Sequence, residues 1–511
     1  MKNKSIMIQG TGSHVGKSIL VCALCRILKQ DGFSVAPFKA QNMALNSFVT
    51  KEGKEMGRAQ VAQAEAAKTE PVVEMNPILL KPTGDCGSQV IVMGKPVGNM
   101  TAKEYYQKKG ELVSVIQDAY TALQRQFDII VIEGAGSPAE INLKDGDIVN
   151  MGMAKMASAP VLLVTDIDRG GAFAWIVGTM ELLNTEERER VKGIVFNKFR
   201  GDKNILKPGL EMIEGRIKRP VIGVVPYLHN LNIDDEDSVS LESYKNNNNG
   251  AENRCLDIVT IKLPRISNFT DFNALAQEDD VNMRLVDNAD DIGKPDMLII
   301  PGTKNTIGDL HFLKERGIFN KIITLSNSGT MIVGICGGYQ MMGKQINDPY
   351  HVESQADGVQ GLCLVNSITT FETTKQTFQV KAKVGAYKAF AGMQEDIQGY
   401  EIHMGSTRFE DAGSCTPFAR IIERAGKQVD IPDGCVSHDG NIMGTYIHGI
   451  FDNDGFRSGL LFYLKQKKGI LATRTSSINT QKTKDDNYNA LAESIRENIN
   501  MNMLYDILQI P

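Results

Sequence analysis

The stretch IMIQGTGSHVGKS, residues 6–18, decides the fold of the first half of the chain. An apolar run ends there in a glycine-rich turn, and a helix is expected to begin at about Lys17. Backbone N–H groups in such a turn point inward, and the dipole of the following helix favours negative charge. The stretch therefore predicts a phosphate-binding loop in which Lys17 reaches the outer phosphates and Ser18 binds Mg²⁺.

This loop departs from the usual G-x-x-x-x-G-K-[ST] pattern, because the first glycine position is occupied by Thr11. A chance Gly-Lys-Ser turn is the alternative, and the strand before it and the helix after it argue against that. The variant GT-x-x-x-VGKS resembles the dethiobiotin synthetase group of phosphate-loop enzymes, which use ATP to make an acyl phosphate or a carbamate. We assign nucleotide binding to Gly10, Thr11, Gly12, Gly16, Lys17 and Ser18.

Apolar runs alternate with helical stretches up to residue 245 and predict a doubly wound α/β domain with a parallel sheet. The runs are continuously apolar, as expected for parallel strands that are covered on both faces. The expected strands are Ile6–Gln9, Ser34–Pro37, Asp128–Glu133, Val161–Thr165, Gly193–Asn197 and Val221–Val225.

Two acids stand at the carboxyl ends of these strands, where ligands bind in such sheets. Glu133 is predicted to hold Mg²⁺ directly or through water, with a helix cap or loop acid as the alternative. Asp166 is more often a loop or cap acid in this setting. Asn197, in GIVFNKF, either contacts the nucleotide base or is a turn residue.

The polar run KNNNNG, Lys245–Gly250, reads as a linker because it cannot contribute to a core. We expect domains at 1–245 and 254–460, a linker at 246–253, and a partly helical tail at 461–511 without an assigned function. After the linker a second α/β domain is expected. Its strands are Leu256–Ile261, Met283–Val286, Met297–Ile300, Ile332–Ile335 and Ile442–Tyr446.

The stretch MIVGICGGYQ, residues 331–340, predicts a nucleophile elbow with Cys336 at the turn between a buried strand and a helix. A helix N-terminus lowers the pKa of a thiol, and a thiolate that attacks a side-chain amide forms a thioester and releases ammonia. His448, in GTYIHGIF, is the predicted base, and a structural histidine is the alternative. The N–H of Gly337, together with Gly302 or Thr303, is predicted to bind the oxyanion, unless Gly302 belongs to a plain turn.

Composition excludes several classes of function. The net charge of -5 lacks the basic footprint of a nucleic-acid binder. Eight cysteines in 511 residues do not make a disulfide scaffold, and Cys22 and Cys25 lie in an apolar run that predicts core packing. No apolar run approaches the roughly 20 residues of a membrane span, and the N-terminal run is too short for a signal peptide. We expect a cytoplasmic enzyme whose partners are small molecules, with neither nucleic acid nor membrane among them.

The sequence resembles the cobyric acid synthase family over about residues 4–455. The motifs that carry the resemblance are GTGSHVGKS, FKAQNMALNS, GRAQVAQAEAA, NPILLKPTGDCGSQVI, VIEGAGSPAEINL, DIDRGGAFA, VFNKFRGD, LPRISNFTDF, PGTKNTIGDL, GICGGYQMMG, GYEIHMG and YIHGIF. KAQNMALNS and DIDRGGAFA distinguish it from the sister enzyme, cobyrinic acid a,c-diamide synthase.

This resemblance implies a dethiobiotin-synthetase-like domain followed by a class I glutamine amidotransferase-like α/β domain. It implies ATP and Mg²⁺ around Lys17, Ser18 and Glu133, with Cys336 as the glutaminase nucleophile and His448 as its base. The implied substrates are ATP, glutamine and a corrinoid, adenosylcobyrinic acid a,c-diamide, whose b, d, e and g carboxylates become amides. Substrate contacts are expected from Asn42, Asn46 and Gln89, although polar loop residues are an equal alternative.

One position departs from the wider class I pattern, in which a glutamate two residues after the base orients it. Here that position is Ile450, and Glu401 and His403 are the candidates to replace the glutamate. Other functions remain open: the sister diamide synthase, a phosphate-loop partitioning or scaffold ATPase, and dethiobiotin synthetase. The last two do not need the second domain with its thiol and imidazole.

Overall fold

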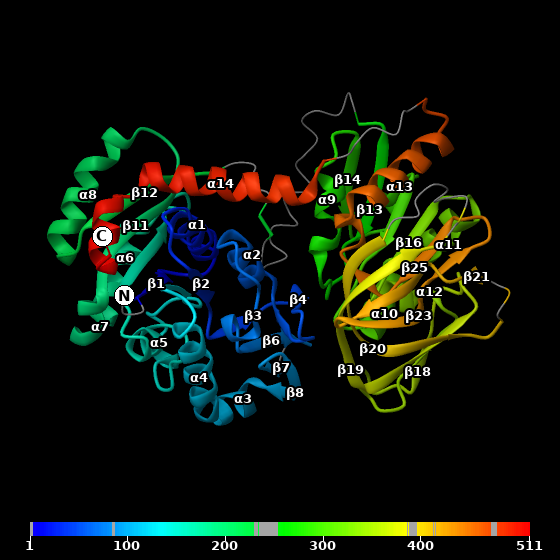
Figure 1. Cartoon of the computed structure of the whole chain (residues 1–511), viewed down its shortest axis with the longest axis horizontal. Coiled ribbons are helices and arrows are strands. Elements are labelled where there is room, and N and C mark those ends of the chain that lie inside the picture. Colours follow the sequence, from blue (N-terminus) through cyan, green and yellow to red (C-terminus); the bar gives the residue numbers. More distant parts are fainter. Residues whose placement is uncertain are drawn as a thin grey trace.

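The computed structural model describes residues 4–83, 87–228, 233–234, 254–385, 387, 396–411, 413, 415–471 and 478–510. It contains two α/β lobes that lie side by side in Figure 1, with the long helix α14 running between them. The expected linker, Lys245–Gly250, lies outside the described residues. The four domain limits stay predictions, and the expected limit at residue 460 falls inside α13 (Asp454–Lys467).

The first lobe is built on a six-stranded parallel sheet in the order β12-β11-β10-β1-β9-β2, as predicted. Its strands overlap the expected ones and are β1 (Lys4–Gly10), β2 (Val35–Phe38), β9 (Ile129–Glu133), β10 (Val161–Asp166), β11 (Val191–Phe199) and β12 (Val221–Pro226). Since β1 lies between β10 and β9, the winding reverses at β1. The crevice outside its carboxyl end is the expected ligand site.

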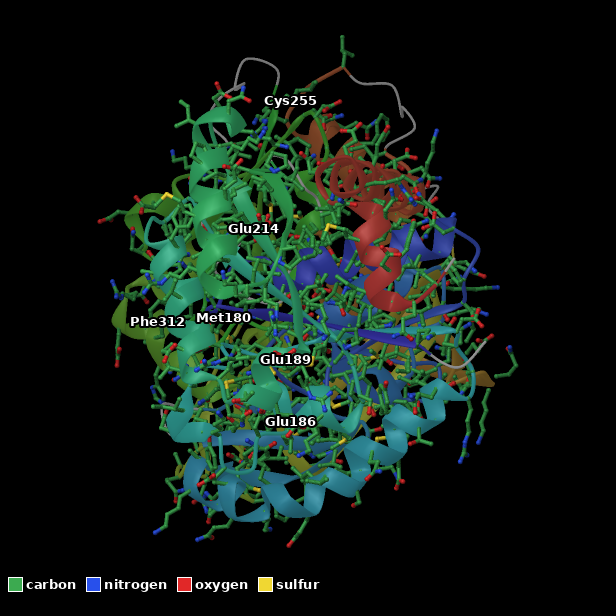
Figure 2. The ribbon with its side chains drawn as sticks, turned by 90° about the vertical axis from the view of Figure 1, so that its left-hand side faces the viewer. Met180, Glu186, Glu189, Glu214, Cys255 and Phe312 are labelled. Carbon is green, nitrogen blue, oxygen red and sulfur yellow. The ribbon has the colours of Figure 1, made fainter. Side chains whose placement is uncertain are left out.

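Helices cover both faces of this sheet. Met7 of β1 enters one core, while Ile6 and Ile8 enter the other, which explains why these three successive residues are all apolar. Cys22 and Cys25 are buried within α1, as expected. Figure 2 views this lobe from its outer flank, where Met180 of α6, Glu186 of α7 and Glu214 of α8 are labelled. The helices are α1 (Lys17–Gln30), α2 (Arg58–Ala66), α3 (Ala102–Lys108), α4 (Leu112–Gln124), α5 (Met151–Met156), α6 (Ala172–Leu182), α7 (Thr185–Arg190) and α8 (Lys203–Ile217).

Between β2 and α4 the chain forms a small four-stranded sheet and a separate hairpin, β4–β5, neither of which was predicted. The small sheet has the order β3-β6-β7-β8. The strands are β3 (Gln41–Met43), β4 (Ser47–Val49), β5 (Glu55–Gly57), β6 (Ile78–Pro82), β7 (Gly87–Val92) and β8 (Lys95–Thr101). Figure 1 shows this part of the first lobe facing the second lobe.

The second lobe contains a seven-stranded sheet in the order β14-β13-β15-β16-β25-β24-β21, and its first five strands run parallel. The five expected strands all overlap members of this parallel part. The strands are β13 (Leu256–Ile261), β14 (Val281–Val286), β15 (Met297–Ile300), β16 (Met331–Ile335), β21 (Cys415–Thr416), β24 (Cys435–Ser437) and β25 (Ile442–Thr445). Its helices are α9 (Asn273–Ala276), α10 (Thr306–Glu315), α11 (Ile318–Asn327), α12 (Gly337–Met342) and α13.

A second, largely antiparallel sheet in this lobe was not predicted from the sequence. Its centre is the long pair β19 (Ser367–Val384) and β20 (Asp396–Phe409). The remaining strands are β17 (Gln345–Asn347), β18 (Gly358–Gln360), β22 (Ala419–Arg424), β23 (Lys427–Asp433) and β26 (Ile447–His448). One face of β19 and β20 meets the β4–β5 hairpin: Gln379 donates to the carbonyl of Val49 at 2.9 Å, and Thr377 donates to that of Gly53 at 2.9 Å.

The tail returns to the first lobe as α14 (Thr480–Asn498) and α15 (Met501–Leu508). Leu491, Ile495 and Leu504 are buried in the same core as α1. Arg26 of α1 donates to Asp485 at 2.7 Å. The chain therefore crosses from one lobe to the other twice. None of the helices within the described ranges combines the length and apolar character that a membrane span requires.

Candidate active sites

The predicted phosphate loop closes over the carboxyl end of β1. Gly16 has φ 98°, a left-handed conformation that suits glycine. A Cβ at Gly10 would lie 2.6 Å from Val15 Cγ2 and 2.8 Å from the Gly12 oxygen, so the tight turn needs glycine there. Lys17 Nζ donates to the carbonyls of Gly12 and Gly136 at 2.9 and 3.0 Å, which places its ammonium across the mouth of the loop.

Glu133 stands at the end of β9, directly beside this loop. Its carboxylate accepts hydrogen bonds from Ser18 Oγ at 2.8 Å, Lys39 Nζ at 3.0 Å and Gln63 Nε2 at 2.5 Å. Burial raises the pKa of Glu133, but the Lys39 ammonium and these hydrogen bonds outweigh burial and hold it below its usual value. An ionised carboxylate next to a serine hydroxyl offers two hard oxygen ligands, which suits Mg²⁺.

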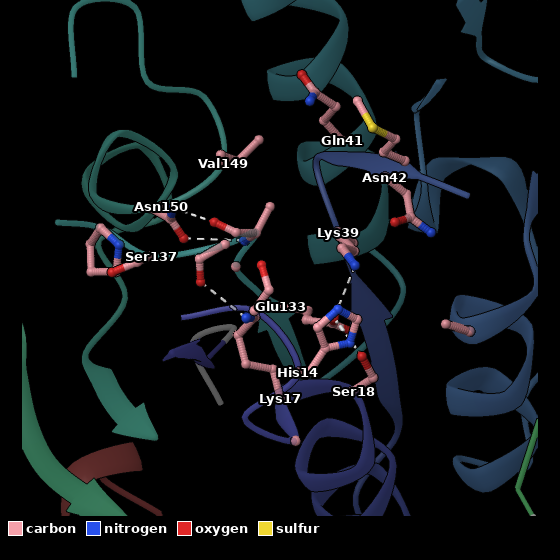
Figure 3. Close-up of a pocket in the computed structure, with 18 of the residues that line it drawn as sticks. His14, Lys17, Ser18, Lys39, Gln41, Asn42, Glu133, Ser137, Val149 and Asn150 are labelled. Atoms are coloured by element: carbon pink, nitrogen blue, oxygen red, sulfur yellow. Dashed lines mark hydrogen bonds and ion pairs between the residues drawn. The ribbon is translucent and has the colours of Figure 1, made fainter. Parts of the chain in front are cut away.

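A cavity of about 940 Å³ opens from the loop across the first lobe. Figure 3 shows Lys17, Ser18, Lys39 and Glu133 gathered at one end, with Asn42 and Asn150 on different sides. Charged side chains of both signs line its wall. The basic ones are Lys17, Lys39, Lys109, Lys144, Arg169 and Lys198, and the acidic ones are Glu133, Glu140, Asp147, Glu187 and Asp234.

The three predicted substrate residues are separated by the fold. Asn42 lines the cavity and donates to Gln60 at 2.9 Å. Asn46 lies at the border between the lobes and accepts from Thr270 Oγ1 at 3.4 Å. Gln89 lies there too and accepts from Lys375 at 3.3 Å.

Two further predicted residues brace the nucleotide loop. Asn197 Nδ2 donates to the carbonyl of Val15 at 2.8 Å. Asp166 accepts from Lys198 Nζ at 2.9 Å, and Lys198 also donates to the His14 carbonyl at 2.7 Å. Both contacts hold the outer side of the loop.

Cys336 sits on a strained turn between β16 and α12. Its φ of 51° and ψ of −108° are unusual for a residue with a side chain. A Cβ at Gly338 would lie 1.9 Å from the Ile300 oxygen, and one at Gly334 would lie 2.2 Å from Met342 Sδ. The elbow thus depends on glycine on both sides. The thiol is 6% exposed and lies 3.5 Å from the carbonyl oxygen of Ile402.

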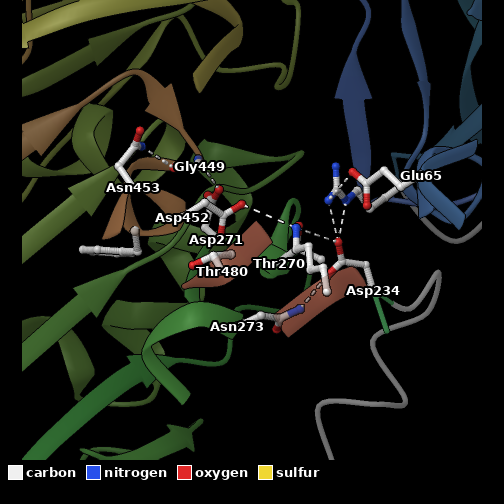
Figure 4. A network of polar contacts seen from close by, with 12 residues as sticks. Glu65, Asp234, Thr270, Asp271, Asn273, Gly449, Asp452, Asn453 and Thr480 are labelled. Carbon is white, nitrogen blue, oxygen red and sulfur yellow. Dashed lines mark hydrogen bonds and ion pairs between the residues drawn. The ribbon is translucent and has the colours of Figure 1, made fainter. Parts of the chain in front are cut away.

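His448 is held on the side away from the thiol by a residue that the sequence did not single out. Its Nδ1 donates to Asp271 Oδ2 at 2.6 Å, and the other oxygen of Asp271 accepts from the Gly449 N–H at 2.8 Å. The Tyr400 ring stacks on the imidazole, with 5.3 Å between centroids and 18° between planes. Figure 4 shows Asp271 beside Gly449 and Asp452.

The charges around His448 set its protonation state. Burial lowers the pKa of His448, but the Asp271 carboxylate, helped by the Cys336 side chain, raises it to about 10. At neutral pH the imidazole is therefore protonated. The Cys336 contribution indicates that the thiol lies near the imidazole, but Nε2 of His448 is buried without a hydrogen-bond partner among the described residues.

The expected orienting residues, Glu401 and His403, have other partners. Glu401 pairs with Arg424 at 2.8 Å. His403 stacks on Tyr446, with 3.9 Å between ring centroids. Asp271 lies in the motif LPRISNFTDF, but nothing in the sequence around it marks this aspartate as a partner of His448.

Gly302 and Gly337, the predicted oxyanion residues, each approach one part of this site. A Cβ at Gly302 would lie 3.0 Å from His448 Cε1. A Cβ at Gly337 would lie 3.1 Å from the Thr303 nitrogen. The backbone at Gly302 is therefore next to the imidazole, and that at Gly337, which directly follows Cys336, is next to Thr303.

Comparison with known proteins matches both lobes. The family model described as "CobQ/CobB/MinD/ParA nucleotide binding domain" matches residues 6–241, and "CobB/CobQ-like glutamine amidotransferase domain" matches residues 257–456. Proteins named cobyric acid synthase are 52% identical in Alkaliphilus metalliredigens, covering 98% of this chain and 99% of the relative, and 52% identical in Clostridium tetani, covering 99% of each. The chain belongs to the cobyric acid synthase family.

As a member of the cobyric acid synthase family, the chain is a glutamine-hydrolysing carbon–nitrogen ligase that acts on small molecules. Its first lobe binds a nucleotide. The Moorella thermoacetica relative, also named cobyric acid synthase, is 50% identical and covers 99% of this chain and 97% of its own length. Both candidate sites and the tail helices therefore fall within the shared length.

Proposed function

We propose that this chain uses ATP and glutamine to amidate the b, d, e and g carboxylates of adenosylcobyrinic acid a,c-diamide, giving adenosylcobyric acid. The observation that carries the proposal is that one chain has both a phosphate loop beside a large cavity and a buried thiol near an imidazole that a carboxylate holds. The product follows from the printed name of the relatives, which align over nearly the whole chain.

In the synthetase half, ATP occupies the loop, and Lys17 reaches the outer phosphates. Ser18 and Glu133 would hold Mg²⁺, which neutralises phosphate charge when bound. A carboxylate at neutral pH is a poor acyl donor. Transfer of the γ-phosphoryl group to a side-chain carboxylate creates an acyl phosphate, from which ammonia displaces phosphate to form the amide.

In the glutaminase half, the nucleophile is the thiolate form of Cys336, and His448 acts beside it as an imidazolium. The sulfur attacks the side-chain amide carbon of glutamine, and the oxyanion is bound by the Gly337 N–H and by Gly302 or Thr303. The C–N bond breaks as His448 protonates the leaving nitrogen, which departs as ammonia. Neutral His448 then takes a proton from the water that attacks the thioester, and glutamate leaves.

The corrinoid occupies the cavity of the first lobe, with Asn42 among its contacts. Asn46 and Gln89, which lie at the border between the lobes, are also proposed to contact the substrate. Because Cys336 must remain reduced to act, the proposal includes a cytoplasmic location.

Mass spectrometry of the product tests this function. Adenosylcobyrinic acid a,c-diamide is incubated with the full chain, ATP, Mg²⁺ and either glutamine or ammonium salt. We expect four carboxylates to become amides with either nitrogen source. Unchanged substrate with both sources, or amidation of cobyrinic acid at a and c instead, would contradict the assignment.

A further inference from the structure

The imidazole of His448 is supported by two residues of its own lobe. Asp271 Oδ2 accepts from Nδ1 at 2.6 Å, so Nε2 is the nitrogen that can serve glutamine. Tyr400 lies over one face of the imidazole, and its ring is stacked there with 5.3 Å between the centroids. Tyr400 is also the direct strand partner of His448 between β20 and β26, and it is only 6% exposed. The position of the Tyr400 ring therefore limits where the imidazole can lie.

The first lobe holds the hydroxyl end of Tyr400. This hydroxyl donates to the carbonyl of Ser47 in β4 at 3.2 Å. Asn268 Nδ2 donates to the same carbonyl at 2.8 Å and to the Tyr400 hydroxyl at 2.7 Å, so the three residues form a network across the border between the lobes. All three are buried, and hydrogen bonds are stronger in such surroundings than in water. The Tyr400 hydroxyl is thus engaged with the first lobe rather than with glutamine.

Phe48 of the same hairpin packs edge-on against the Tyr400 ring, with 5.2 Å between the centroids and 61° between the planes. Such a T-shaped pair adds attraction beyond the burial of apolar area. The Arg58 guanidinium lies over the Phe48 ring, 5.3 Å from its centroid. Arg58 in turn donates to Asp234 at 2.9 Å, and Asp234 lines the cavity of the first lobe. Phe48 is therefore held by its own lobe while it contacts Tyr400 of the other.

The turn that carries Asp271 is bonded to the first lobe as well. Thr270 Oγ1 donates to Asn46 Oδ1 at 3.4 Å. Asn273 Nδ2 donates to Asp234 Oδ1 at 3.0 Å, a contact that Figure 4 shows. Both supports of the imidazole therefore contact the first lobe, one through the ring of Tyr400 and the other through the residues that flank Asp271.

We propose that Tyr400 is a positioning residue through which the β4–β5 hairpin of the first lobe orients His448 for glutamine hydrolysis. The inference rests on the proposed function, in which His448 protonates the leaving nitrogen and then deprotonates water. Both steps need Nε2 within hydrogen-bond reach of the reacting atom, and a displacement of about 1 Å costs roughly 10²-fold in rate. The rate of glutamine hydrolysis therefore depends on contact between the two lobes.

Substitutions on both sides of the border test this role. Phe48→Ala changes only the first lobe, Tyr400→Leu removes the stacked ring, and Tyr400→Phe keeps the ring but loses its hydroxyl. The kcat and KM of glutamine hydrolysis are measured with the full chain. We expect Tyr400→Leu to lower kcat by roughly 10- to 100-fold and Phe48→Ala to lower it several-fold. Tyr400→Phe loses one neutral hydrogen bond and should lower kcat by about 2- to 10-fold. The KM for glutamine should not change, because the contacts with glutamine itself remain.

The double variant Phe48→Ala/Tyr400→Leu decides whether Phe48 acts through Tyr400. If it does, Phe48→Ala should cause no further loss of kcat once the Tyr400 ring is gone. Losses that multiply in the double variant would show independent roles and overturn the proposal. An unchanged kcat in both single variants, or an effect on KM alone, would overturn it as well. If Phe48→Ala does not fold, Phe48→Leu takes its place with the same expectations.

Thr377→Val is the matched control. It removes the hydrogen bond from β19 to the Gly53 carbonyl of the same hairpin and leaves the contacts of Tyr400 in place, so its kcat should equal that of the wild type. A loss of kcat equal to that of Phe48→Ala would show that any weakening of the border slows hydrolysis, and would count against Tyr400. Synthesis from added ammonium salt is measured in every variant. If it falls by the same factor as glutamine hydrolysis, the structure is damaged as a whole and the positioning role is contradicted.

His448→Ala separates this inference from the proposed function. If His448→Ala hydrolyses glutamine at the wild-type rate, the proposed function fails and the positioning role fails with it. If His448→Ala is inactive while the Phe48 and Tyr400 variants match the wild type, only the positioning role fails.

Discussion

His448 Nδ1 donates to Asp271 Oδ2 at 2.6 Å, across 177 residues of sequence. This contact supplies the orienting acid that Ile450 cannot provide. Because the same carboxylate accepts from the Gly449 N–H, it holds both the ring and the backbone next to it.

Asp271→Asn should reduce glutaminase turnover by roughly 10²–10⁴-fold, because the amide cannot stabilise the imidazolium and favours the wrong tautomer. Synthesis from added ammonia should be unchanged. Glutamate release and amide formation are measured side by side. Glu401→Gln is the control, since Glu401 pairs with Arg424. An equal loss of glutaminase turnover in both variants would show that Asp271 does not orient His448.

The pH dependence of stability follows from the same pair. Asp271 raises the pKa of His448 to about 10, above the unfolded value of about 6.5. A raised pKa adds stability that is complete below about pH 6.5 and is lost as pH rises toward 10. The unfolding free energy of the wild type should therefore decline over this window. The unfolding free energy of Asp271→Asn should decline less over the same pH range. Parallel curves of unfolding free energy against pH for the two proteins would contradict the linkage.

Cys336→Ser should abolish glutamine-dependent synthesis and leave synthesis from ammonia intact, since serine at this elbow lacks the acidity of a thiol. Both activities are measured with the same corrinoid. Cys363→Ser makes the same chemical change at an exposed cysteine and should have no effect. If Cys336→Ser loses amide synthesis from ammonia as well as from glutamine, the nucleophile assignment is refuted.

Lys17→Ala should remove amide synthesis from either nitrogen source, by about 10²-fold or more, because the ammonium neutralises phosphate charge in the transition state. It should spare basal glutamine hydrolysis. Lys29→Ala, near the other end of α1, controls for loss of a lysine from that helix. Ammonia-dependent turnover that survives in Lys17→Ala would overturn the loop assignment.

The tail is predicted to be structural for the first lobe. Leu491→Ala leaves a void in the core shared by α14 and α1 and should cost about 2–5 kcal/mol of unfolding free energy. Glu493→Ala, on the exposed side of the same helix, should change it by less than about 0.5 kcal/mol. Denaturant unfolding of both variants measures the difference. Equal stabilities would show that the tail contributes little to this core.

The sequence by itself determined the features that are encoded by neighbouring residues. The phosphate loop and the Cys336 elbow each need a buried strand, small residues and a helix start within about a dozen positions, and these follow from local sterics. The parallel strands were recognisable because both faces of each are covered, which makes them continuously apolar.

Only the tertiary structure decided which distant residues meet. The strand pair β19–β20 has a mixed, half-exposed pattern, so its role at the border between the lobes had no clear local signal. Asp271 reaches His448, and Lys375 reaches Glu55, only after long loops close. The free energy of such contacts depends on burial and on partners from other elements, which no short stretch of sequence specifies.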